Sequence, residues 1–124
     1  MNRLRELAQE FNMSTYDFEE ALGYSRNTIS YIYREKAKMD EDKIIAFCNY
    51  FQVSMEYFLC QTNNGIYVDV LGTTCSLTKE KFLLYKSMNK IEYFNKKRTL
   101  VINSLDEVKF VNSKVPNVEL INEI

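Results

Sequence analysis

Residues 14–33, with the sequence STYDFEEALGYSRNTISYIY, decide the fold of the first half of this chain. Ser14 can cap a helix through its side chain, and Asp17 stands three residues later in the place of a capping-box acid. Apolar residues then recur at helical spacing up to Gly23, where a glycine favours the turn that ends a helix. Ser25 is expected to cap a following helix that extends to the end of the stretch. The sequence therefore predicts two short helices joined by a glycine turn.

Further helices are predicted on both sides of this pair. The chain begins with MNRLRELAQEF, in which the spacing predicts a helix that turns four apolar residues inward, namely Leu4, Leu7, Ala8 and Phe11. A helix that begins near Glu41 is expected to turn another set inward, namely Ile44, Ile45, Phe47, Cys48 and Phe51. A short helix capped by Ser54 holds Tyr57, Phe58 and Leu59. The first part is thus predicted to be an all-α bundle of five helices.

The composition changes at residues 61–65, QTNNG, a polar stretch with Asn-Gly turn chemistry. This stretch is the best candidate for a linker, and it divides the chain into two predicted domains, residues 1–62 and residues 66–124. A chain of 124 residues allows one ordinary domain or two small ones.

The second predicted domain is small and α+β, with one long helix and three to four short strands. Residues 66–71 alternate apolar and polar side chains as a strand does, and the next residues, Gly-Thr-Thr, are expected to turn. Thr78 can cap a helix that reaches about Lys97. Further strand candidates lie at residues 100–103, 108–112 and 118–124.

The long predicted helix is expected to make the chain a homodimer. Its apolar stripe consists of Leu84, Met88, Ile91 and Phe94. So small a sheet can leave part of this stripe uncovered, and a second copy of the chain would cover the rest. The basic residues that follow, Lys96, Lys97 and Arg98, are expected to form a solvated end of the same helix, where cations interact favourably with the helix dipole.

The composition excludes most familiar hydrolase mechanisms, and the chain is not expected to be an enzyme. It contains no histidine, which removes the commonest general base and the commonest metal ligand. Its cysteines, Cys48, Cys60 and Cys75, are odd in number and form no C-x-x-C pair, which argues against a disulfide framework or a zinc site. We therefore expect no metal and no cofactor. The cysteines are expected to be small core residues, and Cys75, near a predicted turn, is the one to test for reactivity.

The chain is predicted to be cytoplasmic and to have no association with a membrane. It shows no apolar signal core and no apolar run of membrane-spanning length. With 16 basic and 17 acidic residues, its net charge of -1 gives no global attraction to nucleic acid. Any affinity for DNA must come from a local cluster of positive charge.

Such a cluster lies at the second helix of the opening stretch. Arg26 and Asn27 are expected at its leading end, and these residue types suit readout of guanine and adenine in the major groove. Ser30 and Tyr31 fall on the same face one turn later. Phosphate contacts are expected from the basic residues that follow, Arg34, Lys36 and Lys38.

Residues 12–59 resemble the lambda-repressor-like, Cro-like (XRE-type) helix-turn-helix domain. The resemblance rests on G-x-S-R-x-T-I-S from Gly23 and on F-x-V-S-x-x-Y-F-L from Phe51, and with the first helix it extends to about residues 2–60. It implies a five-helix bundle that binds an operator, usually as a dimer. It also implies base contacts by Arg26, Asn27, Ser30 and Tyr31, and phosphate contacts by Thr15, Ser25, Arg34, Lys36 and Lys38.

One position departs from this family at the junction of the two central helices. Glu19 stands where the family favours a small alanine. We expect its carboxylate either to tilt the two helices or to point outward.

Two functions follow as hypotheses. The first is a sequence-specific repressor of phage or mobile-element type, which binds double-stranded DNA at an inverted-repeat operator as a dimer. The alternative is an inhibitor of a partner protein, similar to anti-CRISPR proteins, or an antitoxin, whose helix-turn-helix domain regulates its own gene. In that case the second domain binds the partner.

Overall fold

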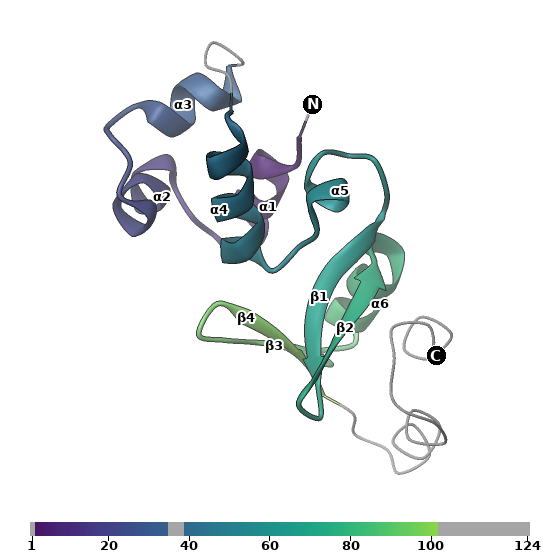
Figure 1. Ribbon diagram of the computed structural model, residues 1–124. Helices are drawn as coiled ribbons and strands as arrows, with labels where there is room; N and C mark the ends of the chain where they lie inside the picture. The colour runs from purple at the N-terminus through teal and green to yellow at the C-terminus, as the bar shows by residue number, and fades with distance from the viewer. Residues whose placement is uncertain (1, 35–38, 102–124) are drawn as a thin grey trace.

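The structure is a computed structural model that describes residues 2–34 and 39–101. A helical region comes first, and a four-stranded sheet with one helix follows it (Figure 1). The first region contains α1 (Leu4–Glu10), α2 (Thr15–Leu22), α3 (Thr28–Tyr33), α4 (Glu41–Phe51) and α5 (Met55–Phe58). The second contains β1 (Asn64–Val70), β2 (Thr73–Thr78), α6 (Lys79–Ser87), β3 (Ile91–Phe94) and β4 (Lys97–Leu100). The predicted order of a helical region before a small α+β region is confirmed.

α2 begins and ends as its sequence predicts. Ser14 Oγ accepts a hydrogen bond from Asp17 N at 3.1 Å, and Asp17 Oδ2 accepts one from Ser14 N at 3.0 Å. These two bonds complete the capping box, and they hold the pKa of the Asp17 carboxyl below its usual value. At the other end Gly23 adopts a left-handed φ of 72°, a conformation that glycine reaches without steric cost.

The predicted inward face of α4 is wrong at one position. Phe47, Cys48 and Phe51 are buried, and Ile44 is half-buried. Ile45 was also expected to face inward, but 40% of its surface is exposed. Residues i, i+3, i+4 and i+7 share one helix face, so the stripe that starts at Ile44 excludes its neighbour.

The sheet joins two antiparallel hairpins through one parallel pair of strands. Its strand order is β2-β1-β4-β3, and Asp69 of β1 lies opposite Thr99 of β4. The β1–β2 and β3–β4 hairpins close through Leu71-Gly72 and Asn95-Lys96, and all four turn residues have positive φ. Turns of this type match the twist of the strands that they connect. α6 packs against β1, β2 and β3 (Figure 1).

The predicted helix from Thr78 to Lys97 is too long. Thr78 caps α6 as expected, since its Oγ1 accepts a hydrogen bond from Lys81 N at 3.2 Å, but the helix ends at Ser87. Asn89 then adopts a left-handed φ of 57°, which asparagine tolerates better than most residues do. The rest of the predicted helix forms β3 and the start of β4.

The strand predictions have mixed outcomes. The strand expected at residues 66–71 is confirmed as β1, but β2 begins at Thr73, within the Gly-Thr-Thr stretch that was expected to turn. Of the candidate at 100–103, only residues 100 and 101 are described, and Leu100 is the last residue of β4. The candidates at 108–112 and 118–124 lie outside the described residues.

Residues 61–65 connect the two regions closely. Gly65 O accepts a hydrogen bond from Ser54 N at 2.8 Å, and Ile66 forms a bridge with Val53. A Cβ at Gly65 would lie 2.1 Å from Ser54 Oγ, so this approach requires glycine. One hydrophobic cluster extends from Leu4 in α1 to Leu100 in β4. The division into domains at 1–62 and 66–124 stays a prediction.

Arg98 forms the deepest polar connection between the regions, and its expected place at a solvated helix end is wrong. It lies in β4, and only 1% of its surface is exposed. Its Nη2 donates to Glu10 Oε1 at 2.7 Å and its Nη1 to Phe51 O at 2.8 Å. The β3–β4 hairpin is thereby attached to the ends of α1 and α4 (Figure 1).

Two of the three cysteines are buried, as expected of small core residues, and Cys60 is not. Cys75 lies in β2 with none of its surface exposed, and burial raises the pKa of its thiol. Cys48 is buried in α4, where burial raises the pKa of its thiol to about 11. Cys60, which follows the C-cap residue of α5, is the exposed thiol among the three.

We expect a thiol reagent at pH 8 to label Cys60 in the folded protein and to leave Cys48 and Cys75 unlabelled until denaturant is added, because only accessible thiolates react quickly. Peptide mass spectrometry after brief labelling measures this directly. Label on Cys75 in the native protein would contradict the buried position of β2.

Candidate nucleic-acid interface

The turn between α2 and α3 differs from its prediction in one respect. Ser25 was expected to cap the next helix, but the N-cap is Asn27, with a left-handed φ of 73°. Ser25 O accepts a hydrogen bond from Thr28 N at 3.2 Å and so closes a tight turn. A residue with positive φ cannot continue an α-helix, and asparagine adopts this conformation readily, so α3 begins only at Thr28. Arg26 therefore lies in the turn before the helix.

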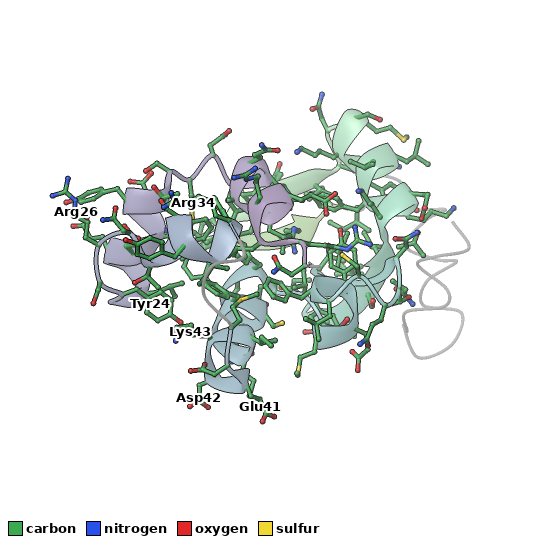
Figure 2. The ribbon with its side chains drawn as sticks, turned by 90° about the horizontal axis from the view of Figure 1, so that it is seen from above. Tyr24, Arg26, Arg34, Glu41, Asp42 and Lys43 are labelled. Atoms are coloured by element: carbon green, nitrogen blue, oxygen red, sulfur yellow. The ribbon has the colours of Figure 1, made fainter. Side chains whose placement is uncertain are left out.

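The side chains predicted to contact bases lie along this turn and α3. Arg26 and Asn27 are exposed, Ser30 is half-buried, and 46% of the surface of Tyr31 is exposed. Figure 2 shows Arg26 extending from the turn at one end of the molecule, away from Glu41 and Asp42 on α4. The opposite face of α3 is buried through Ile29 and Ile32. The structure thus places the four predicted base-contact residues on one short segment.

The residues predicted to contact phosphates are spread around this segment. Thr15 is the first residue of α2 and is half-buried, whereas Ser25 is exposed in the turn. The Arg34 guanidinium carbon lies 5.2 Å from the centroid of the Tyr31 ring, and Arg34 Nε donates to Ser30 O at 3.3 Å. Arg34 therefore stays close to α3. Lys36 and Lys38 lie outside the described residues.

Sequence reasoning missed one basic residue close to α3. Arg5 of α1 holds its guanidinium carbon 4.7 Å from the centroid of the Tyr33 ring, at the last residue of α3. Burial raises the pKa of the Tyr33 hydroxyl, while the charge of Arg5 lowers it by a smaller amount. The whole of α2 lies between Arg5 and Tyr33 in sequence, so no local pattern could predict this contact.

The turn also rests on α4. Tyr24 packs its ring against Phe47, with centroids 5.9 Å apart and planes at 71°. Burial raises the pKa of Tyr24, with a smaller increase from Asp40 and an opposite effect of Lys43. Figure 2 shows Tyr24 and Lys43 on the same side of the molecule. The turn is therefore held in place by side-chain packing against α4 as well as by its backbone hydrogen bonds.

The expectation that Glu19 points outward is wrong, because Glu19 is 7% exposed and its Oε2 accepts a hydrogen bond from Ile29 N at 3.1 Å. The expected tilt of the two helices stays a prediction. Ile29 is the second residue of α3, where a helix has amide groups without intrahelical acceptors. The carboxylate therefore fills the space between the two helices with a specific contact.

The predicted dimerisation stripe is broken because α6 is shorter than expected. Ile91 lies in β3 and is buried, so it is unavailable to a second copy. Leu84 and Met88 are exposed by 48% and 50% at the end of α6, and Phe94 is exposed by 71% on the β3–β4 hairpin. Leu83 of α6, which was not predicted, is also exposed by 50%. The exposed apolar residues therefore lie on two separate parts of the fold, α6 with its C-cap and the β3–β4 hairpin.

Residues 3–59 match the family model of the Cro/C1-type helix-turn-helix DNA-binding domain. This match contains α1 to α5 and the whole candidate interface. Comparisons with curated proteins and with solved structures gave no match. Among residues 2–34 and 39–101, no helix is both long enough and apolar enough to cross a membrane.

Proposed function

Since residues 3–59 are a Cro/C1-type helix-turn-helix DNA-binding domain, which supports a DNA-binding regulator, we propose that this chain is a sequence-specific repressor of phage or mobile-element type. It binds an inverted-repeat operator as a homodimer. Within each copy, α3 and the turn before it enter the major groove, where the donor and acceptor groups of each base pair differ.

The observation that carries this proposal is the composition of the exposed segment. Arg26 and Asn27 stand beside each other in the exposed turn, and Tyr31 follows on the outer face of α3. Arginine can donate two hydrogen bonds to guanine, and asparagine can donate to and accept from adenine. Arg34 supplies positive charge at the end of the same helix, where a phosphate contact would set its position on the duplex.

The net charge of the helical region is consistent with DNA binding that depends on specific contacts. Residues 1–62 carry 7 basic and 10 acidic side chains, so the helical region as a whole does not attract DNA. Arg26 extends away from the acidic start of α4 (Figure 2). We therefore expect weak binding to random duplexes and a strong dependence on salt, because the positive charge is local.

Dimerisation is supported by the exposed apolar residues of α6. Leu83 and Leu84 of α6 and Met88, the C-cap residue of this helix, are each about half exposed. A single exposed apolar side chain is ordinary, whereas neighbouring ones on one helix favour contact with another surface. An isologous contact through α6 brings the same residues of both copies together, as a twofold axis requires.

Selection of binding sites from a pool of random duplexes tests the proposed function. The full chain is expected to enrich an inverted repeat whose half-sites are about one helical turn, roughly 34 Å, apart. Sedimentation of the chain with the selected duplex should show two copies on one site. Failure to enrich any motif would contradict sequence-specific repression. A single copy on the enriched site would contradict dimerisation and would favour the alternative, in which the C-terminal region inhibits a partner protein.

A further inference from the structure

We infer that Glu19 is a positioning residue for DNA readout, which caps α3 from α2 and so sets the geometry of the turn that carries Arg26 and Asn27. The inference rests on the proposed function, in which this turn contacts bases. The N-terminus of α3 needs a side-chain acceptor for its free amide groups, and its N-cap residue does not provide one.

The requirement arises because α3 has no cap of its own. Its N-cap residue, Asn27, makes no side-chain hydrogen bond to the helix. By contrast, α2, α4, α5 and α6 each donate a backbone N–H to the side chain of their N-cap residue. α3 is also the shorter member of the helix-turn-helix pair, with six residues, and a short helix depends strongly on its end contacts.

Glu19 supplies the missing acceptor from the neighbouring helix. Its Oε2 accepts a hydrogen bond from Ile29 N at 3.1 Å, at the second residue of α3. This is one of the positions to which an N-cap side chain normally bonds. A carboxylate at a helix N-terminus also interacts favourably with the partial positive charge of the free amide groups there.

The same residue closes the other side of the turn. Glu19 O accepts hydrogen bonds from Gly23 N, where α2 ends, and from Tyr24 N at 2.9 Å. Its backbone is thus bonded to the beginning of the turn and its side chain to the beginning of α3. The segment between Tyr24 and Ile29, which includes Arg26 and Asn27, is attached at both ends to one residue.

The environment of the carboxylate makes this contact its principal interaction. Glu19 is 7% exposed, and in the described part of the chain it takes part in no ion pair. Burying a carboxylate without a hydrogen-bond donor is unfavourable. The hydrogen bond from Ile29 N therefore satisfies both the buried carboxylate and the amide. Removing the carboxylate leaves a buried amide without an acceptor, at the base of the DNA-reading turn.

The test compares Glu19→Ala and Glu19→Gln in the full chain. Both remove the charge, but glutamine keeps an oxygen that can accept from Ile29 N. We measure binding of each variant to the selected operator and to random duplex DNA by fluorescence anisotropy at one salt concentration. Glu20→Ala is the matched control, because Glu20 is the exposed neighbour on α2 and has the same charge.

Glu19→Ala is expected to lower the ratio of operator affinity to random-duplex affinity by roughly tenfold, the effect of one hydrogen bond in a buried setting. Glu19→Gln should keep this ratio close to that of the unaltered chain, and Glu20→Ala should keep it too. Because both variants lack the charge of Glu19, a change in random-duplex affinity that appears in both of them is due to the lost charge. Thermal unfolding of each variant confirms that the compared proteins are folded at the temperature of the assay.

Hydrogen exchange at the Ile29 amide provides a readout that needs no DNA. Exchange should be faster in Glu19→Ala than in Glu19→Gln, while the amides of α4 stay unchanged. An unaltered affinity ratio in Glu19→Ala, or an equal loss in Glu19→Gln, would overturn the positioning role. Absence of any operator preference in the unaltered chain would instead overturn the proposed function, and exchange at Ile29 would still decide whether Glu19 caps α3.

Discussion

Replacing Arg26 and Asn27 together by alanine is expected to abolish the preference for operator over random DNA. Each side chain is expected to contribute about 1–3 kcal/mol to discrimination if it reads a base. Both side chains are exposed and lie in a turn, and alanine at the left-handed position of Asn27 costs about 1–2 kcal/mol, so the fold should survive the double substitution. Fluorescence anisotropy with both duplexes at one salt concentration measures the effect, and circular dichroism checks the helices.

The control for this prediction is Lys97→Ala, which removes one exposed positive charge from β4. It should leave the ratio of the two affinities unchanged. If the double variant also keeps the ratio of the unaltered chain, the turn before α3 does not read bases. A loss of equal size for both duplexes would assign the two residues to phosphate contacts instead.

Replacing Arg98 by methionine is expected to be the most destabilising single change described here, with a loss of about 3–5 kcal/mol in the free energy of unfolding. Glu10 Oε1 accepts hydrogen bonds from Arg98 Nη2, Arg98 Nε and the Tyr93 hydroxyl, and its side chain is only 12% exposed. Without the guanidinium, a mostly buried carboxylate loses its countercharge. The carbonyl oxygen of Phe51 loses the Arg98 donor as well, whereas that of Gln52 keeps a hydrogen bond from Tyr67 N.

Urea denaturation measures this loss, and the double variant Glu10→Met with Arg98→Met provides the internal check. Because the penalty comes from an unpaired buried charge, removing both partners should cost less than the sum of the single changes. Lys97→Ala, next to Arg98 but exposed, should stay within about 0.5 kcal/mol of the unaltered chain. A loss below about 1 kcal/mol in Arg98→Met would show that the buried contact is not the main connection between the two regions.

Local signals in the sequence predicted most helix starts correctly. Ser14, Ser54 and Thr78 each cap the helix that was expected to follow, because a cap depends on residues only three positions apart. Gly23 ends α2 as predicted for the same reason. The family resemblance of the first half is confirmed by the matched model for residues 3–59.

The errors arose where distant residues or the backbone conformation of asparagine decide the structure. α3 starts late because Asn27 adopts a left-handed conformation and the cap comes from Glu19 on another helix. α6 ends early at Ser87, shortly before Asn89 with its left-handed φ, although apolar spacing continues beyond it. Arg98 lies in a run of basic residues, and only its tertiary partners show that it is buried. No pattern along the chain contains this information.

The central claim is that α3 and the turn before it lie in the major groove of a specific site. Dimethyl sulfate protection tests it most directly, because the reagent methylates guanine N7, which faces the major groove. With the selected operator, we expect protected guanines in two groups about one helical turn apart, and we expect Arg26→Ala to remove protection at one position in each group. Unprotected guanines throughout a duplex that the chain still binds would contradict the claim.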